Sequence, residues 1–108
     1  FTRKRHAPDT STPVELVTVD GMIDAAEVLS HLRREEGVRA VLCEGGPHLF
    51  GQLVSGNLVD DLFLTTTPVA IGGDAPHILE ANLPAEARFE LASLAEAEGD
   101  LFARYRRA

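Results

Sequence analysis

The residue types that could do chemistry gather at positions 44–48, Glu-Gly-Gly-Pro-His, between an apolar run and a segment with helical periodicity. Two glycines allow unusual backbone dihedrals and let a ligand approach the main chain closely. Proline suits the first position of a helix, where its missing N–H costs nothing. The amides of His48, Leu49 and Phe50 should therefore lack helical partners and, with the helix dipole, favour an anion such as a phosphate. A tight turn without any ligand is the alternative, because a glycine pair is a weaker signal than a complete nucleotide-binding signature.

Two strands and a helix must position this turn. Residues 38–43 are mostly apolar and predict a buried strand, residues 49–54 carry apolar side chains at helical spacing, and residues 62–67 predict a second strand. Two strands joined by a packed helix form a right-handed crossover with parallel strands. Ligands of such units bind beyond the carboxyl ends of the strands, beside the helix N-terminus.

The flanking segments extend this alternation. Residues 14–19 predict another strand, and the helix that follows should start at Asp24, with Glu27 in a capping box, and stop at Gly37. The repeated alternation of strand and helix predicts an α/β fold with a mostly parallel sheet. Near the end of the chain, residues 89–95 and 101–106 predict an antiparallel hairpin around the turn at 98–100.

Composition excludes several classes of function. The chain has 108 residues and a formal charge of −7, and this negative charge argues against a nucleic-acid surface. Its one cysteine excludes an internal disulfide. No apolar run approaches the roughly 20 residues of a membrane span. The histidines show no metal-ligand spacing, so we expect no metal. Asp60 and Asp61 should point to opposite faces of a strand and not act as a carboxylate pair. Cys43, in an apolar run, should be a small core residue.

A resemblance to a known family rests on residues 41–73, VLCEGGPHLFGQLVSGNLVDDLFLTTTPVAIGG. The segment resembles the riboflavin-biosynthesis pyrimidine reductases, the C-terminal reductase half of the bifunctional deaminase-reductases. The shared pattern is a strand ending in Glu-Gly-Gly, a helix, Leu-Val-Asp, a strand, then Pro-Val and a Gly-Gly turn. The resemblance implies a dihydrofolate-reductase-like three-layer fold with a mostly parallel sheet and an antiparallel C-terminal hairpin.

The same resemblance implies an NADPH-dependent reductase that converts the ribose of 5-amino-6-(5-phosphoribosylamino)uracil, or of its diamino-pyrimidinone analogue, to a ribityl chain. No catalytic side chain is required, because the nicotinamide carries the chemistry. Glu44 and Thr65 are the expected substrate-binding residues. The basic run Arg3-Lys4-Arg5 would meet the 2′-phosphate of NADPH or form a solvated loop. The expected cofactor-binding residues are Gly45, Gly46, Pro47, His48, Leu49, Phe50 and Gln52.

The resemblance also bears on domain organisation. Residues 1–108 would be the C-terminal portion of one reductase domain whose N-terminal part is absent, and the isolated piece should be inactive and unfold with poor cooperativity. We expect a homodimer in the reducing cytoplasm, completed by the missing part of the same domain. Two alternatives stay open: a dihydrofolate or pteridine reductase on the same fold, and a non-catalytic assembly or dimerisation fragment.

Overall fold

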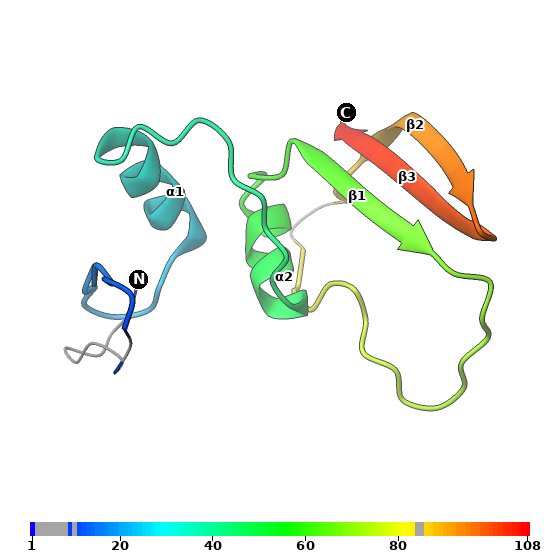
Figure 1. Cartoon of the computed structure of the whole chain (residues 1–108), viewed down its shortest axis with the longest axis horizontal. Coiled ribbons are helices and arrows are strands. Elements are labelled where there is room, and N and C mark those ends of the chain that lie inside the picture. Colours follow the sequence, from blue (N-terminus) through cyan, green and yellow to red (C-terminus); the bar gives the residue numbers. More distant parts are fainter. Residues whose placement is uncertain (2–8, 10, 84–85) are drawn as a thin grey trace. The chain divides into compact units, whose positions relative to one another are not determined.

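The computed structural model describes residues 1, 9, 11–83 and 86–108. The chain divides into two compact units, Phe1–Leu42 and Cys43–Ala108. Two helices and three strands follow one another along it (Figure 1): α1 (Ala25–Arg34), α2 (Pro47–Ser55), β1 (Asp61–Thr66), β2 (Phe89–Ala97) and β3 (Asp100–Arg107).

The first unit is built around α1, whose start and end are as the sequence predicts. The Asp24 carboxylate accepts hydrogen bonds from the amides of Ala26 at 2.7 Å and Glu27 at 3.2 Å, which satisfies two amides that the helix leaves unpaired. After the helix, Gly37 adopts a φ of +66°, in the left-handed region that glycine enters without steric cost. The predicted helix and its N-cap are confirmed.

The predicted parallel strands are not found among the described residues. Residues 14–19 contain only an isolated bridge position at Thr18, and residues 38–43 are extended but pair with no neighbour. Cys43 is exposed, against the expectation of a core position. The physical reason is that an apolar extended segment becomes a buried strand only when hydrogen-bonded neighbours flank it. The described part of the chain supplies none, so the expected mostly parallel sheet is absent from it.

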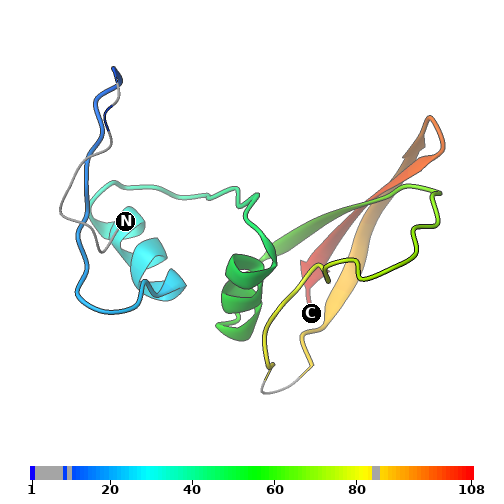
Figure 2. The ribbon, with the colours of Figure 1, turned by 90° about the horizontal axis from the view of Figure 1, so that it is seen from below.

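The second unit contains an antiparallel sheet in the order β1-β3-β2, with β3 in the middle (Figure 2). β2 and β3 form the predicted hairpin. The two residues of its turn, Glu98 and Gly99, have φ values of +55° and +88°. Positive φ at both positions matches a type I′ turn, whose twist suits the right-handed twist of the strands. The Glu96 carboxylate accepts a hydrogen bond from the Gly99 amide at 2.9 Å. The antiparallel hairpin is therefore confirmed.

Helix α2 begins with Pro47 at its first position, as predicted, and buries Gly51, Leu53 and Val54. The chain then reverses through Asn57, which has a φ of +55°, and the Leu58 amide donates to the Leu53 carbonyl at 2.8 Å. This tight reversal joins the end of α2 to the short link before β1.

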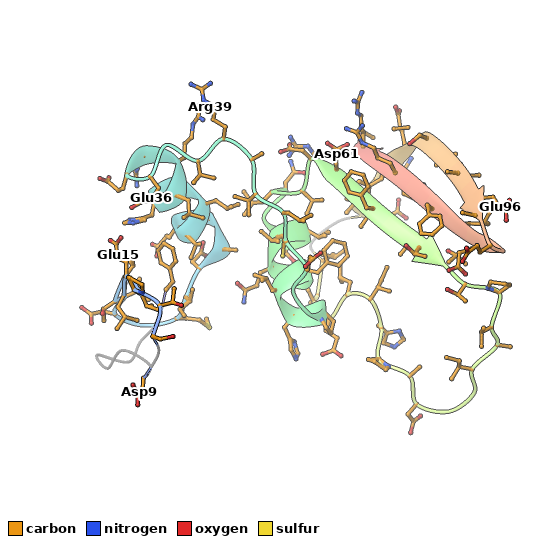
Figure 3. The ribbon with its side chains drawn as sticks, in the orientation of Figure 1. Asp9, Glu15, Glu36, Arg39, Asp61 and Glu96 are labelled. Atoms are coloured by element: carbon orange, nitrogen blue, oxygen red, sulfur yellow. The ribbon has the colours of Figure 1, made fainter. Side chains whose placement is uncertain are left out.

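Little apolar surface is buried in the described residues, where the buried hydrophobic side chains are Ala25, Leu53 and Val54. Figure 3 shows the side chains along the ribbon. Many large hydrophobic side chains are exposed, among them Val41, Leu42, Phe63, Val69, Ile71, Ile78, Leu91, Leu94 and Phe102. Leu42 is 78% exposed and Ile71 80%. Apolar surface exposed on this scale normally marks a region that contacts other protein.

Candidate functional site

The glycine turn before α2 opens onto free space at Gly46. This residue is the N-cap of the helix, with φ −71° and ψ −179°, and no side chain caps the helix there. A Cβ built on Gly46 would meet nothing within 4 Å. The turn is therefore not filled by neighbouring protein, and a ligand can reach the main chain from this side.

The amides of the first helical turn are the groups that such a ligand would meet. Phe50 donates its amide to the Gly46 carbonyl at 3.0 Å, so the expectation that this amide is unpaired is wrong. It is the first amide that can close a helical bond onto the N-cap carbonyl. In the described part of the chain, no hydrogen bond engages the amides of His48 and Leu49. Two donors at the positive end of the helix dipole thus remain for an anion.

The second glycine of the turn has a different reason to be glycine. A Cβ on Gly45 would lie 2.6 Å from Cδ2 of Leu49. The missing side chain at Gly45 therefore makes room for the Leu49 side chain, which lies over the turn. The missing side chain at Gly45 thus accommodates Leu49, whereas the missing side chain at Gly46 leaves free space beside the turn.

A segment distant in sequence packs against α2. The Glu80 carboxylate lies 3.2 Å from Nε2 of His48, and the Glu80 amide donates to the Pro47 carbonyl at 3.1 Å. A Cβ on Gly51 would meet the Glu80 carbonyl oxygen at 2.6 Å and the Ala81 Cβ at 2.8 Å. Glu80 and Gly51 were not among the site residues expected from the sequence. The one available signal was a glycine in the interior of a helix, where alanine is favoured.

The other expected site residues are exposed. The side chains of Glu44 and Gln52 are exposed, and these side chains make no hydrogen bond or ion pair with other described residues. Thr65 lies in β1 opposite Phe102 of β3, on the same face of the sheet as Phe63. The Thr65 side chain is exposed, and in the described part of the chain no hydrogen bond or ion pair joins it to residues 44–52. The structure thus gathers residues 44–52 at one turn and does not bring Thr65 to it.

Two cavities in the described residues lie away from the glycine turn. One of about 280 Å³ is lined by residues that include Val54, Asn57 and Phe89, and one of about 400 Å³ in the first unit is lined by residues that include Ile23 and Val28. Residues 44–52 line neither of them. Neither cavity therefore includes the turn, whose open side is the space beside Gly46.

The two neighbouring aspartates engage different arginines, as expected if they point to opposite faces. Asp61 contacts Arg104 at 2.8 Å and Arg106 at 3.7 Å, whereas Asp60 contacts Arg107 at 2.9 Å. The hydrogen bond from the Arg104 guanidinium lowers the pKa of Asp61 and raises that of Arg104. The contacts are solvent-exposed, so each stabilises the fold only slightly. They join β1 to β3 and do not form a pair for acid–base catalysis.

Among the described residues, no group of three or more His, Cys, Asp or Glu side chains is placed to hold a metal ion. No helix in the described ranges is long and apolar enough to cross a bilayer.

Comparison with known proteins finds a matching family and a similar reductase. The model of the RibD C-terminal domain family matches residues 1–102. The chain is 37% identical over 61 residues to the 2,5-diamino-6-ribosylamino-4(3H)-pyrimidinone 5′-phosphate reductase of Archaeoglobus fulgidus, an alignment that covers 56% of this chain and 27% of the relative.

Two solved structures of Acinetobacter baumannii RibD have the same fold as this chain. Form 2 superposes with a TM-score of 0.73 and form 1 with 0.72, each at 19% identity. Each alignment covers 85% of this chain and 26% of the RibD chain. The chain therefore spans about a quarter of the length of the relatives that it matches. Because the family model extends over nearly all of the sequence, including the glycine turn and β2, the chain belongs to the RibD C-terminal domain family.

Proposed function

We propose that this chain is part of an NADPH-dependent reductase of riboflavin biosynthesis. The reaction would reduce the ribose of 5-amino-6-(5-phosphoribosylamino)uracil, or of its diamino-pyrimidinone analogue, to a ribityl chain. The observation that carries the proposal is the start of α2 in a member of this family. Gly46 faces open space and the amides of His48 and Leu49 are unengaged. The printed name of the Archaeoglobus fulgidus relative supports the substrate class.

The residues of the turn suit a dinucleotide cofactor. Main-chain amides at a helix N-terminus bind phosphate oxygens without any basic side chain. The amides of His48 and Leu49 would bind the diphosphate, with Gly46 leaving room for it and Gln52 one helical turn further on. NADPH, when bound, would supply the hydride. The expected contact of Arg3, Lys4 and Arg5 with its 2′-phosphate lies outside the described residues.

Substrate recognition would depend on Glu44. An aminopyrimidine presents several N–H donors, and an ionised carboxylate offers only acceptors, so the two match. The Glu44 side chain makes no ion pair with the described residues and is exposed beside the glycine turn. Thr65 would complete the pyrimidine site from β1 within a complete domain, because no hydrogen bond joins it to residues 44–52 in the described part of the chain.

We infer that the chain is the C-terminal portion of a single dihydrofolate-reductase-like domain with three layers. Residues 38–43 would then be a strand of a mostly parallel sheet whose neighbours come from residues outside this sequence. Two observations support this inference. The apolar side chains of this run are exposed, Leu42 to 78%, and the chain spans about 26% of the RibD chains that share its fold. Pairing with a second copy of the domain would cover part of the exposed sheet and make a homodimer in the cytoplasm.

The test uses the full-length protein that contains this chain. NADPH oxidation should depend on the phosphoribosylaminopyrimidine and should yield the ribityl product, identified by mass spectrometry. Dihydrofolate in place of the pyrimidine is the matched control. Faster turnover of dihydrofolate or of a pteridine would identify the other reductase class. Absence of NADPH binding would identify a non-catalytic assembly piece and refute the proposal.

A further inference from the structure

Gly51 occupies a position where glycine is unfavourable on local grounds. It lies in the interior of α2 and is buried. Glycine in a helix interior is about 1 kcal/mol less favourable than alanine, because more backbone entropy is lost on folding. A tertiary contact must therefore offset this cost.

The contact is a close approach of main chain to helix. A Cβ on Gly51 would meet the Glu80 carbonyl oxygen at 2.6 Å, the Ala81 Cβ at 2.8 Å and the Glu80 carbonyl carbon at 3.1 Å. Two of these three atoms belong to the backbone, so no side-chain rotation relieves the overlap. Any side chain at Gly51 must displace residues 80 and 81 from the helix.

The displaced residues are the ones that contact the first turn of α2. The Glu80 amide donates to the Pro47 carbonyl at 3.1 Å, and its carboxylate lies 3.2 Å from Nε2 of His48. His48 also carries one of the two unengaged amides. Gly51 is thus coupled, through a segment 30 residues away in sequence, to the residue whose amide faces the proposed ligand.

We propose that Glu80 and Ala81, here called the strap, rest against Gly51 and hold the first turn of α2 in the geometry that binds the diphosphate of the cofactor. Gly51 and Glu80 are then positioning residues that touch no ligand. This inference rests on the proposed function, since it concerns the same turn. Without the strap, the carbonyl of Pro47 and the side chain of His48 lose their contacts, and the two donor amides are no longer fixed.

The test is Gly51→Ala in the full-length protein. Alanine raises local helix propensity, so thermal stability should not fall for a local reason. We expect faster hydrogen exchange of the Glu80 amide without any ligand. The KM for NADPH should rise about tenfold and kcat should stay unchanged. The tenfold rise corresponds to the loss of one hydrogen bond to a charged group. Gly72→Ala is the control, because a Cβ at Gly72 meets nothing within 4 Å.

A second variant tests the same contact in case Gly51→Ala does not fold. Glu80→Pro removes the amide that donates to Pro47 and adds no atom at position 51, and it should raise KM in the same way. Unchanged exchange at Glu80 in Gly51→Ala, or faster exchange with an unchanged KM, would overturn the strap. If the wild-type protein binds no NADPH, that result would instead refute the proposed function, and with it the claim that the strap prepares the turn for the cofactor. The exchange measurement would still decide whether the strap rests against Gly51.

Discussion

Replacement of Gly46 by valine is the sharpest test of the proposed cofactor site. The Cβ of Gly46 would point into space where no protein atom lies within 4 Å, and its φ of −71° is accessible to any residue. The Cβ of a valine therefore meets no described residue and causes no backbone strain. It only places a branched side chain where the diphosphate would approach the amides of His48 and Leu49.

The magnitude follows from the two donors. A hydrogen bond to a charged group contributes about 1.5–3 kcal/mol, so loss of both would weaken NADPH binding by roughly 3–6 kcal/mol, or about a hundredfold to ten-thousandfold. The cost to folding should be about 1 kcal/mol or less, because the helix loses only a preferred N-cap residue. Fluorescence titration with NADPH in the full-length protein measures the first quantity, and chemical denaturation the second.

Gly72→Val provides the matched control for this experiment. A Cβ at Gly72 also meets nothing within 4 Å, and its φ is not in the left-handed region. It should bind NADPH like the wild type. If Gly46→Val retained wild-type affinity while the wild type bound NADPH, the diphosphate could not lie at the start of α2.

Three further predictions concern stability in the full-length protein. The lowered pKa of Asp61 means that its ion pair with Arg104 stabilises the fold above the unfolded pKa of about 4 and is lost as pH falls through the folded value. Asp61→Asn should thus lower the Tm at pH 7 and match the wild type well below pH 4; an equal difference at both pH values would contradict this. Leu42→Ala should cost about 2–5 kcal/mol in denaturation if the rest of the domain covers this residue, and less than about 0.5 kcal/mol if Leu42 stays exposed. Glu98→Asn should raise the Tm, because asparagine tolerates a φ of +55° better than glutamate, and a fall in Tm would refute the assignment of the turn.

Local signals in the sequence predicted the helices well. Asp24 before an apolar-periodic segment predicted the start of α1, and Pro47 after two glycines predicted the start of α2. Each depends on hydrogen bonds or dihedral preferences that span only a few residues. The hairpin of β2 and β3 was found for the same reason, since Gly99 is compatible with a turn that needs positive φ.

The arrangement of the strands was harder to predict from the sequence than the helices and the hairpin. Residues 14–19 and 38–43 have strand-like composition, but the described residues give them no ladder, and the observed sheet is antiparallel throughout. An apolar pattern indicates that a segment prefers a buried position, but it does not indicate which neighbouring segment covers it. The pairing partner of Thr65 is also tertiary information, since only the sheet places it opposite Phe102.

The sequence by itself determined where the glycine turn before α2 lies, because a glycine pair, a proline and helical periodicity act locally. Only the tertiary structure decided how the turn is built: Gly46 opens outward, Gly45 accommodates Leu49, and the Phe50 amide is taken by a helical bond. The contact of Glu80 with His48 and the close approach at Gly51 are likewise tertiary. They join residues about thirty positions apart, and no local propensity encodes which distant backbone will come within contact distance of a helix.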